Sequence, residues 1–346
     1  MKRAFFRAAV GLTALPENQL DLSRFLRWAA HDHILGQVAA AHVDEAGGKL
    51  KDVLENARIR SAHDRRMLTF EADRISRALL GSGIEPVLLK GGAYVAAGLR
   101  AGRGRRVSDI DILVEDQRLA ETEVLLREAG WQGDSSTAGD YDQQYYRRWM
   151  HELPPMRHGT RRTLIDVHHR LLPRTARLQP RHDLMMAASV KLESTGLRAF
   201  SPMDRFIHSA IHICADGAFE TVARSFIELY YLFGDLEADD RRRLIDRAAE
   251  VNALKPVASA LWAVSHYFGS ANAHAALRSM GVMKVGVALR FILRVVVRGG
   301  RLAPVARLAL YVRSHYMRMP LAMLAKHLFS KAFKRGGQAR ATRSGG

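Results

Sequence analysis

The chain has 346 residues, 48% of them apolar, which is enough to form the hydrophobic core of one large domain or two ordinary ones. Its single cysteine, Cys214, excludes a disulfide within the chain and fits a reducing cytoplasm, and in the apolar run SAIHICA we interpret it as a small buried hydrophobe. No stretch reaches the roughly eighteen uncharged apolar residues of a membrane span, and Arg7 interrupts the apolar run that a signal peptide would need. We therefore expect a cytoplasmic protein, either soluble or peripheral on the inner membrane surface.

The net charge of +18 is concentrated in the last quarter of the chain. Residues 251–346 contain sixteen Lys or Arg and no Asp or Glu. Residues 1–250 contain the remaining 37 basic and 35 acidic residues, a net charge of +2. This uneven distribution indicates that the two parts of the chain serve different functions.

The first third of the chain is predicted to be helical and then to enter a sheet. Apolar residues at helical spacing predict helices over residues 17–45 and 48–80. After the breakers in GSGIEP, the run VLLK at 87–90 is typical of a short strand, and a short helix is expected over 93–100. The segment VSDIDILVE at 107–115 is the clearest strand, because apolar and acidic residues alternate along it.

The next segments continue the alternation of helix and strand. A capped amphipathic helix is predicted over 116–130, where Gly130 ends it, and a Ser-, Gly- and Asp-rich loop over 134–144. Two strands are predicted over 144–153 and 162–171, joined by the hairpin-like connection PPMRHGT. From residue 181 the pattern is helical, with polar breaks.

This order predicts a small α/β core with a mixed sheet, placed between two helical regions. The tail 336–346 has low complexity, and we expect it to be disordered. The predicted divisions are an N-terminal helical region at 1–80, a catalytic core at 81–180, a helical subdomain at 181–250 and a basic helical region at 251–346.

Two carboxylates in the clearest strand suggest a metal site. Asp109 and Asp111 are two residues apart, so their side chains leave the strand on the same face. Like charges held so close together are stable mainly with a cation between them, and ligation by oxygen alone favours Mg²⁺. Asp166, in the later strand LIDVH, would complete a two-metal site for phosphoryl transfer.

A glycine pair precedes this strand by a spacing that suits phosphate binding. Gly91 and Gly92 lie between a strand and a helix start, and Asp109 follows Gly92 by seventeen residues. Without side chains, both glycines let phosphates approach backbone N–H groups. Lys90, Arg105 and Arg106 are close in sequence and would add cationic contacts.

The motifs LLKGGAY, RRVSDIDILV and LIDVHHRL together resemble the uncharacterised nucleotidyltransferase family of the DNA polymerase beta superfamily. The resemblance covers about residues 20–235 and is weaker over the helices near DRFIHSAIHICADG and FIELYYL. One departure is Glu228, where the related helical motif has Asp. The positions that match the family pattern are Lys90, Gly91, Arg106, Asp109, Asp111, Asp166 and His168.

The resemblance implies a polymerase-beta-type fold and transfer of a nucleoside monophosphate from an NTP such as ATP, with release of pyrophosphate. Asp109, Asp111 and Asp166 would bind Mg²⁺, and Asp166 would also help to deprotonate a hydroxyl acceptor, either a small molecule, a protein or an RNA. The expected nucleotide contacts are Lys90, Gly91, Gly92, Arg106 and His168. Two alternatives stay open: a toxin that modifies tRNA or protein, and a non-catalytic nucleotide-binding module at the membrane.

Several histidines have both a functional and a structural interpretation. His168 shares the face of Asp166 and would contact phosphate, orient a carboxylate or serve the fold, while His169 points to the opposite face. His151 is a further candidate for the same cleft. The helical spacing of His208, His212 and Asp216 fits zinc, but we favour buried structural histidines there. The sequence HDH at 31–33 is similar to phosphohydrolase motifs only superficially.

The region 285–335 combines apolar helical stretches with regularly spaced cations. Arg290, Arg294 and Arg298 recur every four residues and line one side of a predicted helix. Three interpretations remain: contact with an anionic membrane surface, binding of RNA or another polyanion, or packing on the core with solvated positive faces. No obligate protein partner is evident from the sequence.

Overall fold

The structure is a computed structural model that describes residues 2–133, 150–216, 221–281 and 286–318. Its centre is a mixed seven-stranded sheet in the order β3-β4-β5-β2-β1-β7-β6, in which the pairs β2/β5 and β1/β7 are parallel and the others antiparallel. The α/β core between helical regions is therefore confirmed. The strands are β1 (Val87–Leu88), β2 (Asp109–Leu113), β3 (Trp131–Gly133), β4 (Met156–His158), β5 (Leu164–His168), β6 (Val190–Lys191) and β7 (Arg198–Ala199).

Strands β2 and β5 lie at the middle of the sheet because alternate residues on both are fully apolar. Ile112 of β2 and Ile165 and Val167 of β5 are completely buried. Side chains of successive strand residues point to opposite faces, so the acidic residues between them share the other face of the sheet. The alternation read from the sequence thus fixes which face belongs to the core and which to the site.

The N-terminal helices are α1 (Lys2–Ala9), α2 (Gln19–His31), α3 (Leu35–His42) and α4 (Gly48–Ala78). The predicted helix over 48–80 is confirmed, and the helical stretch predicted over 17–45 is divided into α2 and α3. His33 has a left-handed backbone with φ of 56°, which ends the first of two helices. Helix α1 packs Phe6 against the rings of Tyr267 and Phe268, so the N-terminal helix shares a core with a segment about 260 residues later in the chain.

The helices between the first strands are α5 (Lys90–Ala96) and α6 (Leu119–Glu128), with short 3₁₀ turns η1 (Arg100–Gly102) and η2 (Asp116–Arg118). Helix α5 begins three residues earlier than predicted, so Gly91 and Gly92 lie inside its first turn rather than before it. Lys90 starts this turn with φ of 48°, a left-handed conformation that is unusual for a lysine. The strand therefore turns sharply into the helix at Lys90.

The hairpin before β5 differs from the prediction. Residues 144–149 of the predicted strand 144–153 lie outside the described residues. In the remainder, Glu152 makes an isolated bridge to His168. The strand that pairs antiparallel with β5 is β4, which lies in the predicted connection. Pro154 and Pro155 cannot donate ladder hydrogen bonds, so regular pairing starts only after them.

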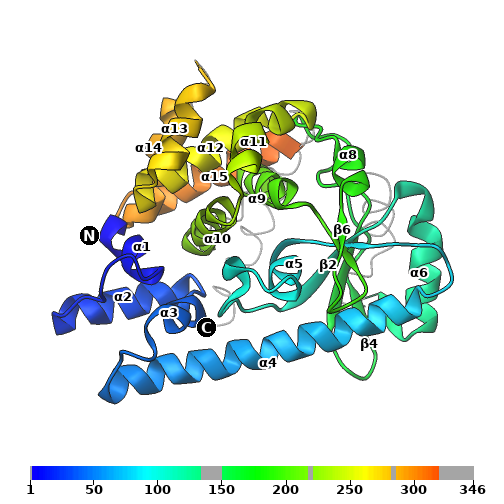
Figure 1. The fold of residues 1–346 in the computed structure, drawn as a ribbon, viewed down its shortest axis with the longest axis horizontal. Helices are drawn as coiled ribbons and strands as arrows, with labels where there is room; N and C mark the ends of the chain where they lie inside the picture. Colours follow the sequence, from blue (N-terminus) through cyan, green and yellow to red (C-terminus); the bar gives the residue numbers. More distant parts are fainter. Residues whose placement is uncertain (1, 134–149, 217–220, 282–285, 319–346) are drawn as a thin grey trace, which may run out of the picture.

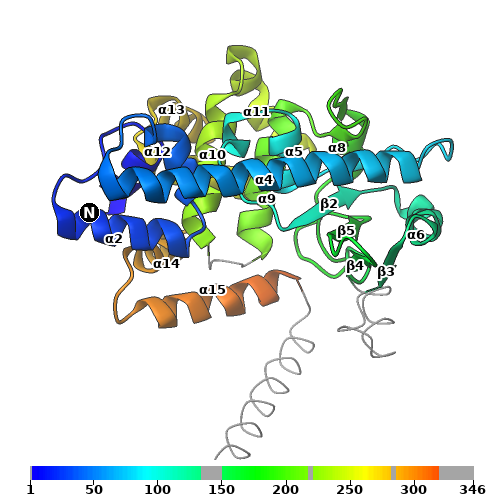
Figure 2. The same cartoon turned by 90° about the horizontal axis from the view of Figure 1, so that it is seen from below.

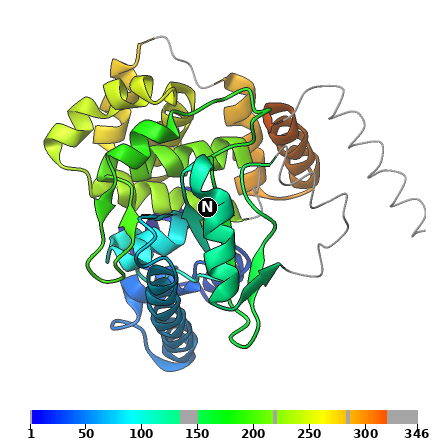
Figure 3. The ribbon, with the colours of Figure 1, turned by 90° about the vertical axis from the view of Figure 1, so that its right-hand side faces the viewer.

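The C-terminal half is helical, as predicted, apart from the short hairpin β6–β7 at the sheet edge. Its helices lie above the sheet and α5, whereas α4 runs beneath them (Figures 1 and 3). None of the helices in the described ranges is long and apolar enough to cross a membrane. The helices are α8 (His182–Ala187), α9 (Pro202–Asp216), α10 (Val222–Gly234), α11 (Ala238–Glu250), α12 (Leu254–Phe268), α13 (Ala271–Ser279), α14 (Val287–Arg298) and α15 (Ala303–Arg318).

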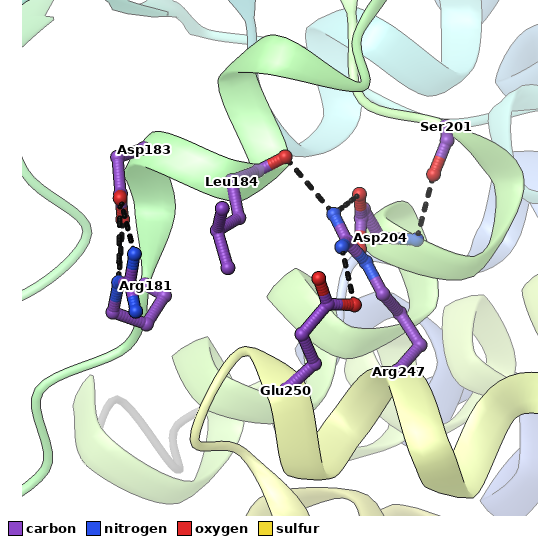
Figure 4. A network of polar contacts seen from close by, with 7 residues as sticks. All are labelled: Arg181, Asp183, Leu184, Ser201, Asp204, Arg247 and Glu250. Atoms are coloured by element: carbon purple, nitrogen blue, oxygen red, sulfur yellow. Dashed lines mark hydrogen bonds and ion pairs between the residues drawn. The ribbon is translucent and has the colours of Figure 1, made fainter.

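A buried ion pair fixes helix α9 in this layer (Figure 4). Asp204 has no exposed side-chain surface, and its two carboxylate oxygens accept hydrogen bonds of 2.9 Å from Nε and Nη2 of Arg247 on α11. Arg247 also donates to the carbonyl of Leu184 on α8 and to Glu250. One guanidinium thus joins three helices, which matters because α9 carries residues toward the site.

Candidate functional site

The three predicted carboxylates lie together on one face of the sheet. Asp111 on β2 is the direct neighbour of Asp166 on β5 in the parallel pairing, and Asp109 precedes Asp111 by two residues. Asp111 is buried, whereas Asp109 and Asp166 are partly exposed. The hydroxyl of Ser108 donates to Asp109 at 2.8 Å. Two strands that are 55 residues apart in the sequence therefore bring the carboxylates into one group.

Asp111 has two partners on the same oxygen. Its Oδ1 accepts from Nζ of Lys90 at 2.6 Å and lies 2.9 Å from Nε2 of His168. Burial disfavours the charged carboxylate, but the attraction of Lys90 and His168 outweighs it, so the pKa of Asp111 lies well below its usual range. Asp111 is thus held as a carboxylate that the protein itself orients.

Asp166 has the opposite electrostatic environment. Burial, and then the negative charges of Asp111 and Glu152, raise its pKa to about 7. Within the described residues no ion pair to a Lys or Arg offsets this repulsion at Asp166. Carboxylate oxygens are hard donors, and a divalent cation would relieve the repulsion between Asp111 and Asp166. The donor set therefore fits Mg²⁺, with Asp109, Asp111 and Asp166 as the residues that would hold it.

A cavity of about 200 Å³ lies directly beside Asp166. The sequence did not identify four of its charged or imidazole side chains as site residues: Glu152, His208, His212 and Arg318. The two histidines are four residues apart, so one face of α9 brings both to the cavity. The full lining is Leu89, Lys90, Met150, His151, Glu152, Asp166, His168, Leu171, Leu172, His208, His212 and Arg318.

His151, Glu152 and His168 form a tight cluster in the cavity wall. Nδ1 of His168 lies 3.3 Å from Oε2 of Glu152, and Nε2 of His151 lies 3.8 Å from the same oxygen. Burial, and then the positive charges nearby, lower the pKa of His151 to about 2, so this imidazole is neutral at pH 7. His151 and Asp166 line the same cavity, as the sequence analysis considered for His151.

The glycine pair has close neighbours in the structure. A Cβ on Gly91 would stand 2.5 Å from Cζ of Arg105, and one on Gly92 would stand 3.2 Å from Leu88. The Arg105 guanidinium in turn pairs with Glu228 at 2.7 Å, and both side chains are nearly buried. Gly91 thus makes room for this ion pair, which gives Glu228 a structural partner on another element.

The remaining candidates lie in varied surroundings. Arg106 donates to Asp64 on α4 and is half exposed. His169 points away from Asp166 and lies 2.9 Å from Asp116. In the segment HDH, Asp32 accepts from the backbone N–H of Ala223, which gives it a structural role. The side chain of Asp216 lies outside the described residues.

Comparison with curated proteins and with solved structures finds no match to this chain. A comparison with protein families does find one. The matched segment spans 252 residues and includes the β2 and β5 carboxylates and the α9 histidines. The match supports nucleotidyl transfer as the general reaction. The model of the uncharacterised nucleotidyltransferase family matches residues 18–269, and the protein therefore belongs to that family.

Proposed function

We propose that this protein is a Mg²⁺-dependent nucleotidyltransferase that moves a nucleoside monophosphate from an NTP to a hydroxyl acceptor. The observation that supports this best is the pairing of Asp111 and Asp166 on neighbouring parallel strands, with Asp109 on the same face. Such a group of carboxylates is suited to a divalent cation that also takes phosphate oxygens as ligands. The family match agrees with this class of reaction.

In the proposed reaction the acceptor oxygen attacks the α-phosphorus of the NTP. A new oxygen–phosphorus bond forms, the bond from the α-phosphorus to the β-phosphate oxygen breaks, and pyrophosphate leaves. When bound, Mg²⁺ neutralises charge on the phosphates. Asp166 lines the cavity and would accept the hydroxyl proton, while Lys90 and His168 keep Asp111 oriented as a ligand.

For the triphosphate we propose the contacts expected from the sequence. Lys90 lies beside Asp111, and Gly91 and Gly92 follow it in the first turn of α5, so their backbone and the lysine charge would meet the β- and γ-phosphates. His168 would contact phosphate only by leaving its present partner Asp111. Arg106 would have to leave Asp64, and its half-exposed side chain permits that movement.

The test is incubation of the purified protein with each α-labelled NTP and Mg²⁺ in lysate, followed by identification of the labelled species. We expect one NTP to give a labelled product, and the variant carrying Asp109→Ala and Asp111→Ala to give none. Label in tRNA or in a protein would identify that acceptor, which the toxin-like alternative requires, whereas label in a small molecule would contradict that alternative. Full transfer by the double variant would contradict the proposed metal site.

We also propose that helices α14 and α15 rest on an anionic membrane surface. Helix α15 buries Ala303, Ala306 and Leu310 against the protein, yet Val305 and Leu308 on another side of it are 64% and 60% exposed. Figure 2 shows α15 along the lower edge of the molecule. The helix therefore has a second apolar face, whose exposure in water carries a free-energy cost.

The charges around this apolar face match an anionic surface. On the same pair of helices and the turn between them, Phe291 and Leu302 are 63% and 65% exposed, and Arg294, Arg298 and Arg301 are exposed as well. Each such cation contributes about 1 kcal/mol of attraction to an anionic leaflet. The absence of Asp and Glu from residues 251–346 removes any repulsion from acidic side chains of this region.

Sedimentation with lipid vesicles tests this contact. We expect binding to phosphatidylglycerol-containing vesicles, much weaker binding to pure phosphatidylcholine, and loss of binding in the variant Leu302→Ser with Leu308→Ser. Leu80→Ser changes an 84% exposed leucine on another surface and serves as the control. Equal binding by the double variant and the wild type, or binding to RNA but not to vesicles, would contradict the proposal.

A further inference from the structure

His151 and Glu152 have no assigned task in nucleotidyl transfer, and they lie beside His168, which orients Asp111. One donor atom from each residue lies within 4.8 Å of the other two, in a wall of the cavity beside Asp166. Nδ1 of His151 is buried and has no hydrogen-bond partner in the described part of the chain. The buried imidazole of His168, the partly buried imidazole of His151 and the Glu152 carboxylate thus converge on a space that no described side chain occupies.

We propose that His151, Glu152 and His168 form a second metal site, specific for a transition metal such as Zn²⁺ and separate from the three aspartates. Ligands about 2.0 Å from a tetrahedral zinc ion lie about 3.3 Å from one another. The observed separations from Oε2 of Glu152 are 3.3 Å to His168 and 3.8 Å to His151. Small side-chain movements would complete the three-ligand geometry.

The surroundings of His168 are those of a metal-binding histidine. Its Nε2 lies 2.9 Å from Asp111, a carboxylate that can only accept, so the N–H on that nitrogen donates to it, and Nδ1 faces Oε2 of Glu152 at 3.3 Å. A lone pair that faces a carboxylate oxygen at 3.3 Å is repelled by it, unless a cation or a proton lies between them. Metal-bound histidines characteristically donate their second N–H to a carboxylate in this way.

The charges near the cluster favour a nitrogen-binding metal over Mg²⁺. Lys90 and Arg318 also line the cavity, and their positive charges oppose a bound cation. A hard ion held mainly by charge would be disfavoured there, whereas zinc also forms strong bonds with neutral imidazole nitrogens. The cavity leaves a fourth position open to water or to a substrate oxygen. Because the metal contacts His168, it would also fix the orientation of Asp111.

The test is zinc content measured by mass spectrometry on untagged protein, after chelator treatment and dialysis against Zn²⁺. We expect about one zinc ion per chain in the wild type. His151→Ala and Glu152→Gln should each weaken zinc binding by about tenfold or more, in line with the loss of a ligand. His63→Ala alters an exposed histidine on α4, and Asp109→Asn alters the Mg²⁺ site; both should keep the zinc.

The proposed zinc site does not depend on nucleotidyl transfer. An Asp109→Asn variant that loses transfer but retains zinc would show that the zinc site and the transfer site are distinct. A second measurement avoids variants altogether: cobalt(II) bound to the wild type should give the intense visible absorption of a four-coordinate site. The proposal is overturned if the wild type retains no zinc, if His151→Ala and Glu152→Gln bind zinc as tightly as the wild type, or if cobalt gives only the weak spectrum of an octahedral ion.

Discussion

The buried pair of Arg247 and Asp204 permits a quantitative test of the helical layer that supports the site. Arg247→Ala removes two hydrogen bonds of 2.9 Å from a carboxylate with no exposed surface, together with the bond to the Leu184 carbonyl. Breaking one side of a buried pair leaves an uncompensated charge and costs about 3–5 kcal/mol. Because Arg247 is itself 14% exposed, we expect the lower end, about 3 kcal/mol.

Thermal unfolding followed by circular dichroism measures this loss. Unfolding entropy of about 2.1 cal/mol/K per residue gives roughly 0.7 kcal/mol/K for a chain of this length, so the melting temperature should fall by about 4 °C. Arg242→Ala breaks a highly exposed pair with Asp239 on the same helix and should change stability by less than about 0.5 kcal/mol.

Asp204→Asn in the Arg247→Ala background provides a second check. It should restore part of the loss, because an unpaired amide costs less to bury than an unpaired carboxylate. Equal melting temperatures for Arg247→Ala and Arg242→Ala would refute the reasoning, since the buried carboxylate would then have no need of its partner.

Two further predictions concern residues around the site. Gly91→Ala should displace Arg105 from Glu228 and lower the free energy of unfolding, measured with urea, by about 1–3 kcal/mol. Gly133 has open space around it, so Gly133→Ala is the control and should be nearly neutral. Equal effects of the two substitutions would show that the close contact at Gly91 is unimportant. Burial lowers the pKa of His208 well below its usual value, so below pH 6.5 the unfolded chain takes up a proton that the folded protein does not. Stability should therefore fall as pH falls from 6.5, and His208→Gln should reduce this dependence by up to about 1.4 kcal/mol per pH unit. An unchanged pH dependence in His208→Gln would contradict the neutral buried state.

The parts of the fold that the sequence predicted depend on strong local periodicity. The alternation in SDIDIL and LIDVH fixed both the strands and the shared face of Asp109, Asp111 and Asp166, because a strand has a period of two. The predicted helix over 48–80 agrees with α4 for the same kind of reason. Strands β3, β6 and β7 have two or three residues each, too short for any periodicity to appear.

The cavity could not be predicted from the sequence because its wall comes from distant segments. His151 and Glu152 precede β4, His208 and His212 lie on α9, and Arg318 ends α15. A pair of histidines four residues apart among isoleucines has the same appearance whether its helix faces a core or a cavity. The packing of α9 against its neighbours, to which the Arg247–Asp204 pair contributes, decides between the two. The domain divisions at 80, 180 and 250 stay predictions, although core residues come from all four ranges.

The transfer rate of Asp166→Asn at saturating NTP and Mg²⁺ tests the central claim most directly. The substitution keeps the size of the side chain but removes its charge and its ability to accept a proton. Our account predicts that the variant still binds the NTP and loses transfer to the identified acceptor by about a hundredfold or more. Transfer at the wild-type rate would show that the three carboxylates of β2 and β5 are not the catalytic centre.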